Sequence, residues 1–370
     1  MATGFFWSEA CFWHAGGNFA GMLPVGGFVE PLNGGLPESP ESKRRLKNLL
    51  DVSGLAGELV MTAAEAASEE DILRVHPESY VSDFKSLSDA DGGNLGLRAP
   101  FGPGGFRIAA QSAGLAKDAL TAVLNGRLTN AYALSRPPGH HCLPDWPNGF
   151  CLLANIPIAI EAARAAGLAQ RFAVLDWDVH HGNGTEAIYL DDPDVLTVSI
   201  HQDRNYPLDT GRADVRGPAG TNLNIPLPAG TGHVGYLAAM DRLALPAIRA
   251  FAPDVLIIAC GFDAALNDPL GRMLATAETF GAMTDRVLDL AGEVCGGRLV
   301  MVHEGGYSEV YVPFCGHRVL ERMTASDIRV PDPFEPAFSQ RQPSAGVDAF
   351  VMGVIAEMAE ALGPSYLSSD

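Results

Sequence analysis

The chain contains 370 residues, of which 47% are hydrophobic, and its formal net charge at pH 7 is −19. The length exceeds that of a usual domain but still allows one large α/β domain, and the apolar content suffices for a core. The negative charge argues against a nucleic-acid-binding surface, because phosphate contacts need Lys and Arg. It would tolerate or attract a cationic substrate, although acidity that only keeps the protein soluble is the alternative.

Two further features concern the compartment in which the chain works. No Lys or Arg precedes Lys43, so the positively charged start of a signal peptide is missing, and no apolar run reaches the roughly 18 residues of a membrane span. The six cysteines form no CxxC pair, which indicates reduced thiols in a cytoplasmic protein: Cys11, Cys142, Cys151, Cys260, Cys295 and Cys315. A redox pair between Cys142 and Cys151, which flank one predicted loop, is the alternative.

The N-terminal third of the chain is irregular in pattern. Residues 1–42 are rich in aromatic side chains and Gly, and we expect a first strand followed by a loop that folds over another part of the molecule. Residues 41–50, 69–75 and 106–124 are predicted helices. The Gly- and Pro-rich stretch 87–105 is predicted to be a long surface loop.

From residue 131 onward, short apolar runs alternate with helical segments. The predicted strands cover residues 131–134, 172–175, 195–200, 255–259 and 299–302. The predicted helices cover residues 156–166, 185–190, 232–251 (with a kink at Pro246) and 277–294. This alternation predicts a parallel sheet covered by helices on both faces. We see no linker or internal repeat, and therefore expect residues 1–370 to form a single domain.

Polar and chemically reactive residues follow all five predicted strands. The segments in question are 135–141, 176–185, 201–203, 260–263 and 303–307. Open parallel sheets bind their ligands at the carboxyl ends of the strands, so these segments are predicted to form one site.

A metal centre is the first chemistry that these segments indicate. Asp178 and His180 are two residues apart and therefore point to the same side of an extended backbone. One oxygen and one nitrogen ligand suit zinc, and Asp263 is the natural third ligand. Three protein ligands leave coordination positions open for a water that the metal would activate. Local capping of a strand end or a helix is the structural alternative for these residues.

Acid–base and oxyanion-stabilising groups are the second chemistry that these segments indicate. His140 and His141 follow a rigid Pro-Pro-Gly turn, and one of them could move a proton between the water and a leaving amine. Asp176 is the candidate carboxylate partner that fixes its tautomer. Tyr307 follows Gly305-Gly306 and could donate a hydrogen bond to a developing oxyanion, with a packed core tyrosine as the alternative.

Six motifs in order then resemble one known family. They are PPGHH (137–141), GFC (149–151), DWDVHHGNGT (176–185), GFDA (261–264), DPLG (268–271) and EGGY (304–307). The set resembles the histone deacetylase superfamily, and its class II-like motif sequences are closest to those of bacterial histone deacetylase-like amidohydrolases. The resemblance covers roughly residues 5–325. It implies an α/β, arginase/deacetylase-like three-layer fold with a central parallel sheet flanked by helices, and zinc-dependent removal of acyl groups from amines.

The resemblance also implies roles for individual residues. Asp178, His180 and Asp263 match the zinc ligands, His140 and His141 the paired catalytic histidines, and Tyr307 the oxyanion-stabilising tyrosine. Gly149 and Phe150 match the walls of an acyl-lysine tunnel. A structural potassium ion is implied at the backbone carbonyls of Asp176, Asp178, His180 and Ile200 with the side chains of Asp176 and Ser199; oxygen ligands suit such a cation.

Three positions bear on activity and substrate choice. Asn183 stands where class I members carry an aspartate beside the second histidine; class II members share the Asn, which predicts a weaker base. Tyr206 stands where the facing tunnel aromatic is usually Phe, and it adds a polar tip to an apolar slot. Leu270 stands where polyamine-specialised members carry Glu, which predicts acyl-lysine-type substrates over acetylpolyamines.

Other functions remain open at this point. An acetylpolyamine deacetylase is the main alternative. A binuclear manganese ureohydrolase would need further Asp ligands where His181, Gly182, Asn183, Ala264 and Ala265 stand. A non-catalytic acyl-lysine binder is disfavoured by the presence of Tyr307. A homo-oligomer is compatible with the sequence, which sets no oligomeric state.

Overall fold

A computed structural model describes residues 2–17, 19–25, 27–30, 32 and 35–363. Its centre is an eight-stranded sheet made of β1 (Thr3–Phe6), β4 (Leu59–Thr62), β7 (Asn130–Ala133), β8 (Phe172–Asp176), β9 (Val195–Gln202), β10 (Asn222–Leu227), β11 (Val255–Cys260) and β12 (Leu299–His303). The strand order is β10-β9-β8-β11-β12-β7-β1-β4, and every neighbouring pair is parallel. The parallel sheet and its five predicted strands are confirmed.

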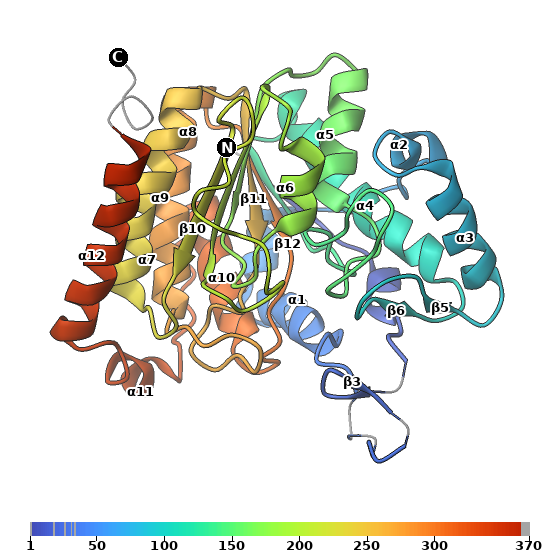
Figure 1. Cartoon of the computed structure of the whole chain (residues 1–370), viewed down its shortest axis with the longest axis horizontal. Helices are drawn as coiled ribbons and strands as arrows, with labels where there is room; N and C mark the ends of the chain where they lie inside the picture. The colour runs from blue at the N-terminus through green and yellow to red at the C-terminus, as the bar shows by residue number, and fades with distance from the viewer. Residues whose placement is uncertain (1, 18, 26, 31, 33–34, 364–370) are drawn as a thin grey trace.

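Helices cover both faces of this sheet, which gives three layers (Figure 1). One face carries α4 (Gly105–Leu124), α5 (Asn155–Ala165) and α6 (Asn183–Tyr189). The other carries α1 (Glu41–Ser53), α7 (His233–Ala239), α8 (Leu245–Phe251), α9 (Ala277–Cys295), α10 (Val312–Thr324) and α12 (Ala345–Leu362). Three further α-helices are α2 (Glu69–Leu73), α3 (Glu78–Asp89) and α11 (Glu335–Ser339).

Alternate residues of each central strand enter the two cores. In β8, Ala173 and Leu175 pack in the core on the α9 side, while Phe172 and Val174 pack in the core on the α4 side. Side chains alternate between the two faces of a strand, so a continuous apolar run is what a strand buried on both faces requires. The three-layer fold predicted from the sequence is thus confirmed.

The structure also contains elements that the sequence analysis did not assign. The two sheet edges, β4 and β10, are missing from the prediction, as are α3 and every helix after residue 302. Within the predicted loop 87–105 lie the end of α3 and two short strands, β5 (Gly93–Asn94) and β6 (Pro100–Phe101). The predicted helix 232–251 is interrupted by a π-helical turn, Met240–Ala244, directly before α8, because Pro246 has no N–H with which to continue the ladder.

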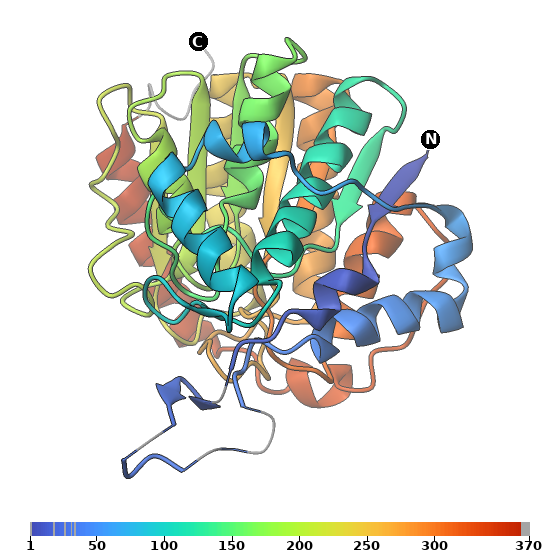
Figure 2. The ribbon, with the colours of Figure 1, turned by 90° about the vertical axis from the view of Figure 1, so that its right-hand side faces the viewer.

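The N-terminal segment partly folds over the carboxyl edge of the sheet. Phe19 and Leu36 pack against Phe150 and Tyr307. Between them, the part of the chain that contains β2 (Phe19–Ala20) and β3 (Leu23–Pro24) projects from the body of the molecule, and Phe28 is fully exposed there (Figure 2).

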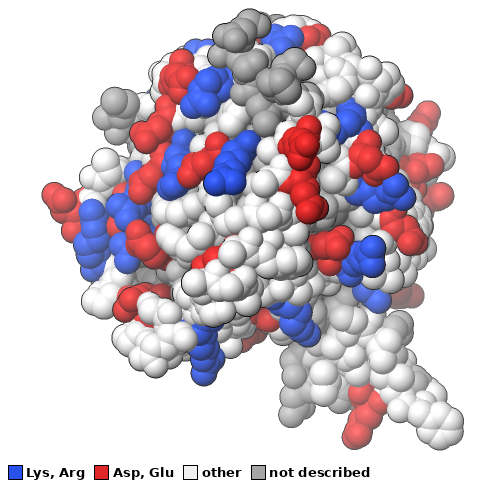
Figure 3. All heavy atoms as spheres, turned by 60° about the vertical axis from the view of Figure 1, so that its left-hand side comes forward, with Lys and Arg blue, Asp and Glu red and all other residues white. Residues whose placement is uncertain are grey.

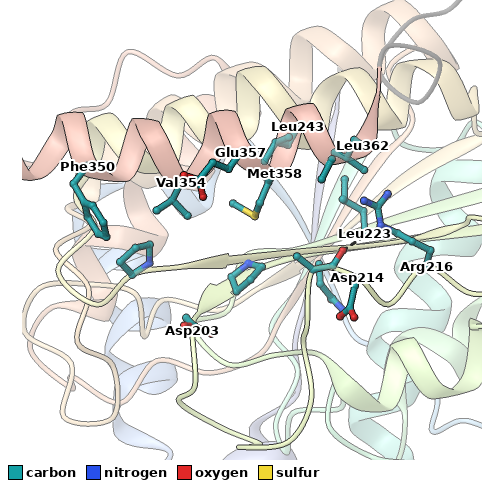
Figure 4. A pocket seen from close by; sticks show the side chains of 15 residues that line it. Asp203, Asp214, Arg216, Leu223, Leu243, Phe350, Val354, Glu357, Met358 and Leu362 are labelled. Atoms are coloured by element: carbon teal, nitrogen blue, oxygen red, sulfur yellow. Dashed lines mark hydrogen bonds between the residues drawn. The ribbon is translucent and has the colours of Figure 1, made fainter.

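A groove lies between α12 and the edge strand β10. It has a volume of about 890 Å³, and Leu223, Leu243, Val354 and Met358 contribute to its apolar lining (Figure 4). On this side of the molecule an area with few charged side chains is surrounded by Lys, Arg, Asp and Glu (Figure 3). Among the described residues, no helix combines the length and apolarity needed to span a bilayer.

Candidate active site

The polar segments that follow β7, β8, β11 and β12 meet around one cavity of about 700 Å³. The predicted segment 201–203 after β9 does not line this cavity, but residues 205–210, which follow it, do. Residues from the predicted site line it in two groups. His141, His180 and Tyr307 lie at its floor, and Gly149, Phe150, Tyr206 and Leu270 form its walls. The residues that the sequence analysis assigned to substrate binding are therefore brought together in space.

Three potential metal ligands converge beside this floor. Nδ1 of His180 lies 3.0 Å from Oδ1 of Asp178 and 3.0 Å from Oδ2 of Asp263. All three residues are buried. The other oxygen of each carboxylate is held by a backbone amide: Oδ2 of Asp178 accepts from Gly305 N at 2.8 Å, and Oδ1 of Asp263 accepts from Val179 N at 2.8 Å. Each carboxylate thus presents one oriented oxygen to a common point.

Close packing around the three residues explains a glycine in the EGGY motif. A Cβ at Gly305 would lie 2.2 Å from Oδ2 of Asp263 and 2.6 Å from Oδ2 of Asp178. Any side chain at this position would displace a carboxylate. The glycine therefore lets the backbone approach closely enough to donate to Asp178.

The electrostatics of the group fit a bound cation. Burial and the Asp178 charge raise the pKa of Asp263 to about 6. Burial would lower the pKa of His180, but Asp263 and Asp178 outweigh it and raise that pKa to about 10. Two buried carboxylates facing one imidazole nitrogen repel each other, and a divalent cation would relieve the repulsion. Two oxygens and one nitrogen are a donor set that suits zinc.

His140 is paired with a carboxylate, as the sequence analysis proposed. Its Nδ1 lies 2.9 Å from Oδ2 of Asp176, whose Oδ1 accepts from Asp178 N at 2.9 Å. Burial alone would lower the pKa of His140, but Asp178 and then Asp176 raise it to about 10. This imidazole is therefore held in its charged form.

His141 has the opposite environment. Its Nδ1 lies 2.7 Å from Oδ1 of Asn183, an oxygen that can only accept, so the proton is on Nδ1 and Nε2 is a bare acceptor. Burial, then the charges of His140 and His180, keep the pKa of His141 well below its usual value. The rings of His140 and His141 are 4.0 Å apart, and their environments shift their pKa values in opposite directions.

The ring of Tyr307 lies 6.3 Å from the ring of His180, which in turn lies 5.9 Å from the ring of His141. The backbone N of Tyr307 donates to Oδ2 of Asp268 at 2.8 Å, and its ring packs edge-on against Phe150 at 5.7 Å. Within the described part of the chain its hydroxyl has no hydrogen-bond partner, although the side chain is only 9% exposed. Burial and the nearby charges of Asp263 and Asp178 hold the pKa of Tyr307 well above 10, so its hydroxyl keeps a proton to donate.

The cavity walls depend on backbone conformations that are rare for residues with side chains. Phe150 has φ of 67° and follows Gly149, where φ is 54°. A Cβ at Gly149 would lie 2.3 Å from the His141 ring and 2.9 Å from the Tyr206 ring, so this wall is in contact with both. The hydroxyl of Tyr206 donates to Oδ1 of Asn148 at 2.7 Å.

Other sequence predictions stay untested or lose support. The potassium site, including the Ile200 carbonyl, stays a prediction. Both carboxylate oxygens of Asp176 form hydrogen bonds, one with His140 and one with the backbone N of Asp178. The Ser199 hydroxyl is hydrogen bonded to Nδ1 of His201 at 2.9 Å. Cys142 and Cys151 are buried free thiols whose pKa values are raised mainly by burial, which gives no support to a redox pair. His181 bonds to Thr210 and Glu186 instead of facing a second metal.

Two residues near the histidines were given no role from the sequence. Oε2 of Glu304 accepts from the backbone N of Gly139 at 2.7 Å and of His140 at 3.1 Å. The side chain of Asn148 donates to the His141 carbonyl at 2.6 Å. Their only sequence signal was position, since one opens the EGGY motif and the other precedes GFC.

Comparisons with known proteins agree with this geometry. Residues 36–323 match the model of the histone deacetylase domain. The chain is 54% identical over 366 residues to a histone deacetylase-like amidohydrolase of Pseudomonas aeruginosa, covering 98% of this chain and 96% of the relative. It is 37% identical over 318 residues to a probable deacetylase of Archaeoglobus fulgidus, covering 83% of this chain and 88% of the relative.

A solved structure of a related domain has the same fold as this chain. The HDA15 HD domain superposes with a TM-score of 0.81 at 30% sequence identity, covering 99% of this chain and 97% of that one. The fold, the ordered motifs and these relatives together place the chain in the histone deacetylase family, as a member of its deacetylase and amidohydrolase enzymes.

Proposed function

We propose that this chain is a zinc-dependent amidohydrolase that removes acetyl or other acyl groups from acylated amines, with acyl-lysine-type substrates favoured. The observation that carries the proposal is the arrangement around one cavity: a three-ligand metal group, a neutral His141 with a bare Nε2, and a Tyr307 hydroxyl that has no hydrogen-bond partner among the described residues. These are a Lewis-acid site, a general base and an oxyanion donor, in the positions that amide hydrolysis needs.

Asp178, His180 and Asp263 would hold the zinc ion. When bound, the ion polarises the amide carbonyl and lowers the pKa of the attacking water. The backbone donors Gly305 and Val179 fix the orientation of the two carboxylates, so that the ligand atoms are arranged before binding.

His141 is the proposed general base and later the general acid. Its neutral Nε2 can accept a proton from water and return it to the departing amine, while Nδ1 stays bonded to Asn183. His140, charged and paired with Asp176, supplies positive charge beside the reacting atoms and keeps the pKa of His141 low.

Tyr307 is the proposed oxyanion donor. Its hydroxyl would donate to the carbonyl oxygen as that oxygen gains charge, a contact that is stronger in the transition state than in the ground state. Packing of its ring against Phe150 and the Asp268 bond to its backbone hold the phenol in place.

The walls support an elongated, partly apolar substrate. Phe150, Tyr206 and Leu270 surround the route to the floor, which suits the methylene stem of an acylated lysine. Leu270 offers no charge to the internal cation of a polyamine, so acetylpolyamine deacetylation remains the second candidate.

The test is a turnover screen of acyl-lysine peptides and acetylpolyamines on zinc-loaded protein. We expect hydrolysis of an acetyl-lysine peptide, and in His141→Ala a kcat lower by ~10²-fold or more at unchanged zinc content. Absence of turnover for every acyl amine, with tight binding of the same compounds, would instead indicate a non-catalytic acyl-lysine binder.

A further inference from the structure

Arg98 is a charged residue at the mouth of the catalytic cavity that the mechanism above does not use. Its guanidinium lies over the Tyr206 ring, 5.4 Å from the ring centroid, and Tyr206 itself is 6.1 Å from the His180 ring. Arg98 therefore contacts the aromatic ring that in turn lies beside His180, one of the proposed metal ligands. Among the described residues it forms no ion pair, so its charge is free to meet a ligand.

The position of Arg98 is fixed by its backbone. Its φ of 57° is rare for a residue with a side chain. Gly149 N donates to the Leu97 carbonyl at 3.0 Å, and Phe150 N donates to the Arg98 carbonyl at 2.9 Å. These bonds tie the segment to the wall that contacts His141, and such an unfavourable conformation persists only where the surroundings hold it. The cation is thus built into the cavity wall.

We infer that Arg98 is a specificity-determining residue that binds a carboxylate on the amine side of the substrate. The acyl group must face the floor, so a lysine stem of four methylene groups carries its backbone outward past Tyr206, toward the guanidinium. The preferred substrate class is an acyl-lysine whose backbone end bears a carboxylate, supplied by the free α-carboxyl group or by a neighbouring acidic side chain. This inference rests on the proposed function.

The chemistry of the mouth favours an anion over a cation. Arginine forms paired hydrogen bonds with a carboxylate and can do so while stacked on an aromatic ring. Asp209 is the other charged residue of the lining apart from the histidines, and no ion pair joins it to Arg98. The net charge of −19 acts at long range in the opposite direction, in favour of cations, and added salt screens that effect more strongly than a partly buried contact.

The chain offers a matched control in Arg204. It also has positive φ, at 52°, but its side chain is 88% exposed and does not line the cavity. Arg98→Gln and Arg204→Gln therefore remove the same charge from the same backbone conformation, inside and outside the mouth. Arg98→Lys keeps the charge but loses the planar fork.

The experiment compares kcat/KM for matched pairs on zinc-loaded protein: Nε-acetyl-lysine with a free α-carboxylate against its α-carboxamide, and an acetyl-lysine peptide followed by Asp against the same peptide followed by Asn. We expect wild type to prefer at least one carboxylate partner by about 5-fold, mainly through KM, since this contact is equal in ground and transition states. Arg98→Gln should abolish the preference, Arg98→Lys should reduce it, and Arg204→Gln should retain it.

The pair that shows the preference identifies the source of the carboxylate. Equal kcat/KM within both pairs in wild type, or a preference that survives Arg98→Gln, would overturn the inference while leaving the proposed function intact. Failure to hydrolyse even the neutral substrates would instead refute the proposed function, and the inference with it.

Discussion

The floor and the mouth of the cavity are built in different ways. At the floor, Asp178 and Asp263 are fully buried, and backbone amides or imidazoles engage all four of their oxygens. At the mouth, Leu97, Trp146 and Leu208 are 46%, 42% and 71% exposed. A rigid floor can set the reaction, because its groups need no reorganisation, whereas an open mouth of mixed chemistry can set only which substrate enters.

Removing a metal ligand at the floor should lower activity more than any substitution at the mouth. Asp178→Ala, His180→Ala and Asp263→Ala should each abolish zinc binding and detectable turnover, because a three-ligand site has none to spare. Zinc per chain and kcat are the measurements, with circular dichroism as the control for folding. Stoichiometric zinc in any one variant would remove that residue from the ligand set.

Tyr307→Phe tests the floor without disturbing the metal. Losing one preorganised donor should lower kcat by ~10²–10³-fold with little change in substrate binding. The ring packing against Phe150 is retained, so stability should not change. A kcat close to that of wild type would make Tyr307 a structural residue only.

Asn183→Asp tests the protonation state assigned to His141. A carboxylate bonded to Nδ1 should raise the low pKa of His141, by about one unit. The base works in its neutral form, so activity is lost as pH falls through this pKa, and the acidic limb of the kcat/KM profile should move to higher pH. An unmoved acidic limb would show that His141 is not the titrating base.

Leu270→Glu should have the smallest effect, at the mouth. A carboxylate there should shift the ratio of kcat/KM for N8-acetylspermidine to that for an acetyl-lysine peptide toward the polyamine, by about 5-fold, the scale of a partly exposed ion pair. Leu270→Gln is the uncharged control. If the ratio is the same in all three proteins, residue 270 does not contact the bound amine.

Features that depend on local sequence could be predicted, whereas contacts between residues far apart in the chain could not. The central strands, and residues such as Asp178, His180 and Asp263, were accessible because apolar runs and motif spacing are local properties. The edge strand β10 was missed because Asn222, Asn224 and Pro226 break the apolar pattern. Glu304 acts on residues about 165 positions away through backbone amides, and Arg98 reaches the cavity through a left-handed conformation in a predicted loop. Neither contact leaves a signal in local sequence.

Zinc titration of metal-free protein, followed by hydrolysis of an acetyl-lysine peptide, tests the central claim most directly. We predict that activity rises linearly with added zinc and stops rising at one equivalent per chain, and that His141→Ala binds the same single equivalent but turns over ~10²-fold more slowly or worse. Activity that requires two equivalents of manganese, or a zinc-loaded wild type that hydrolyses no acyl amine, would contradict it.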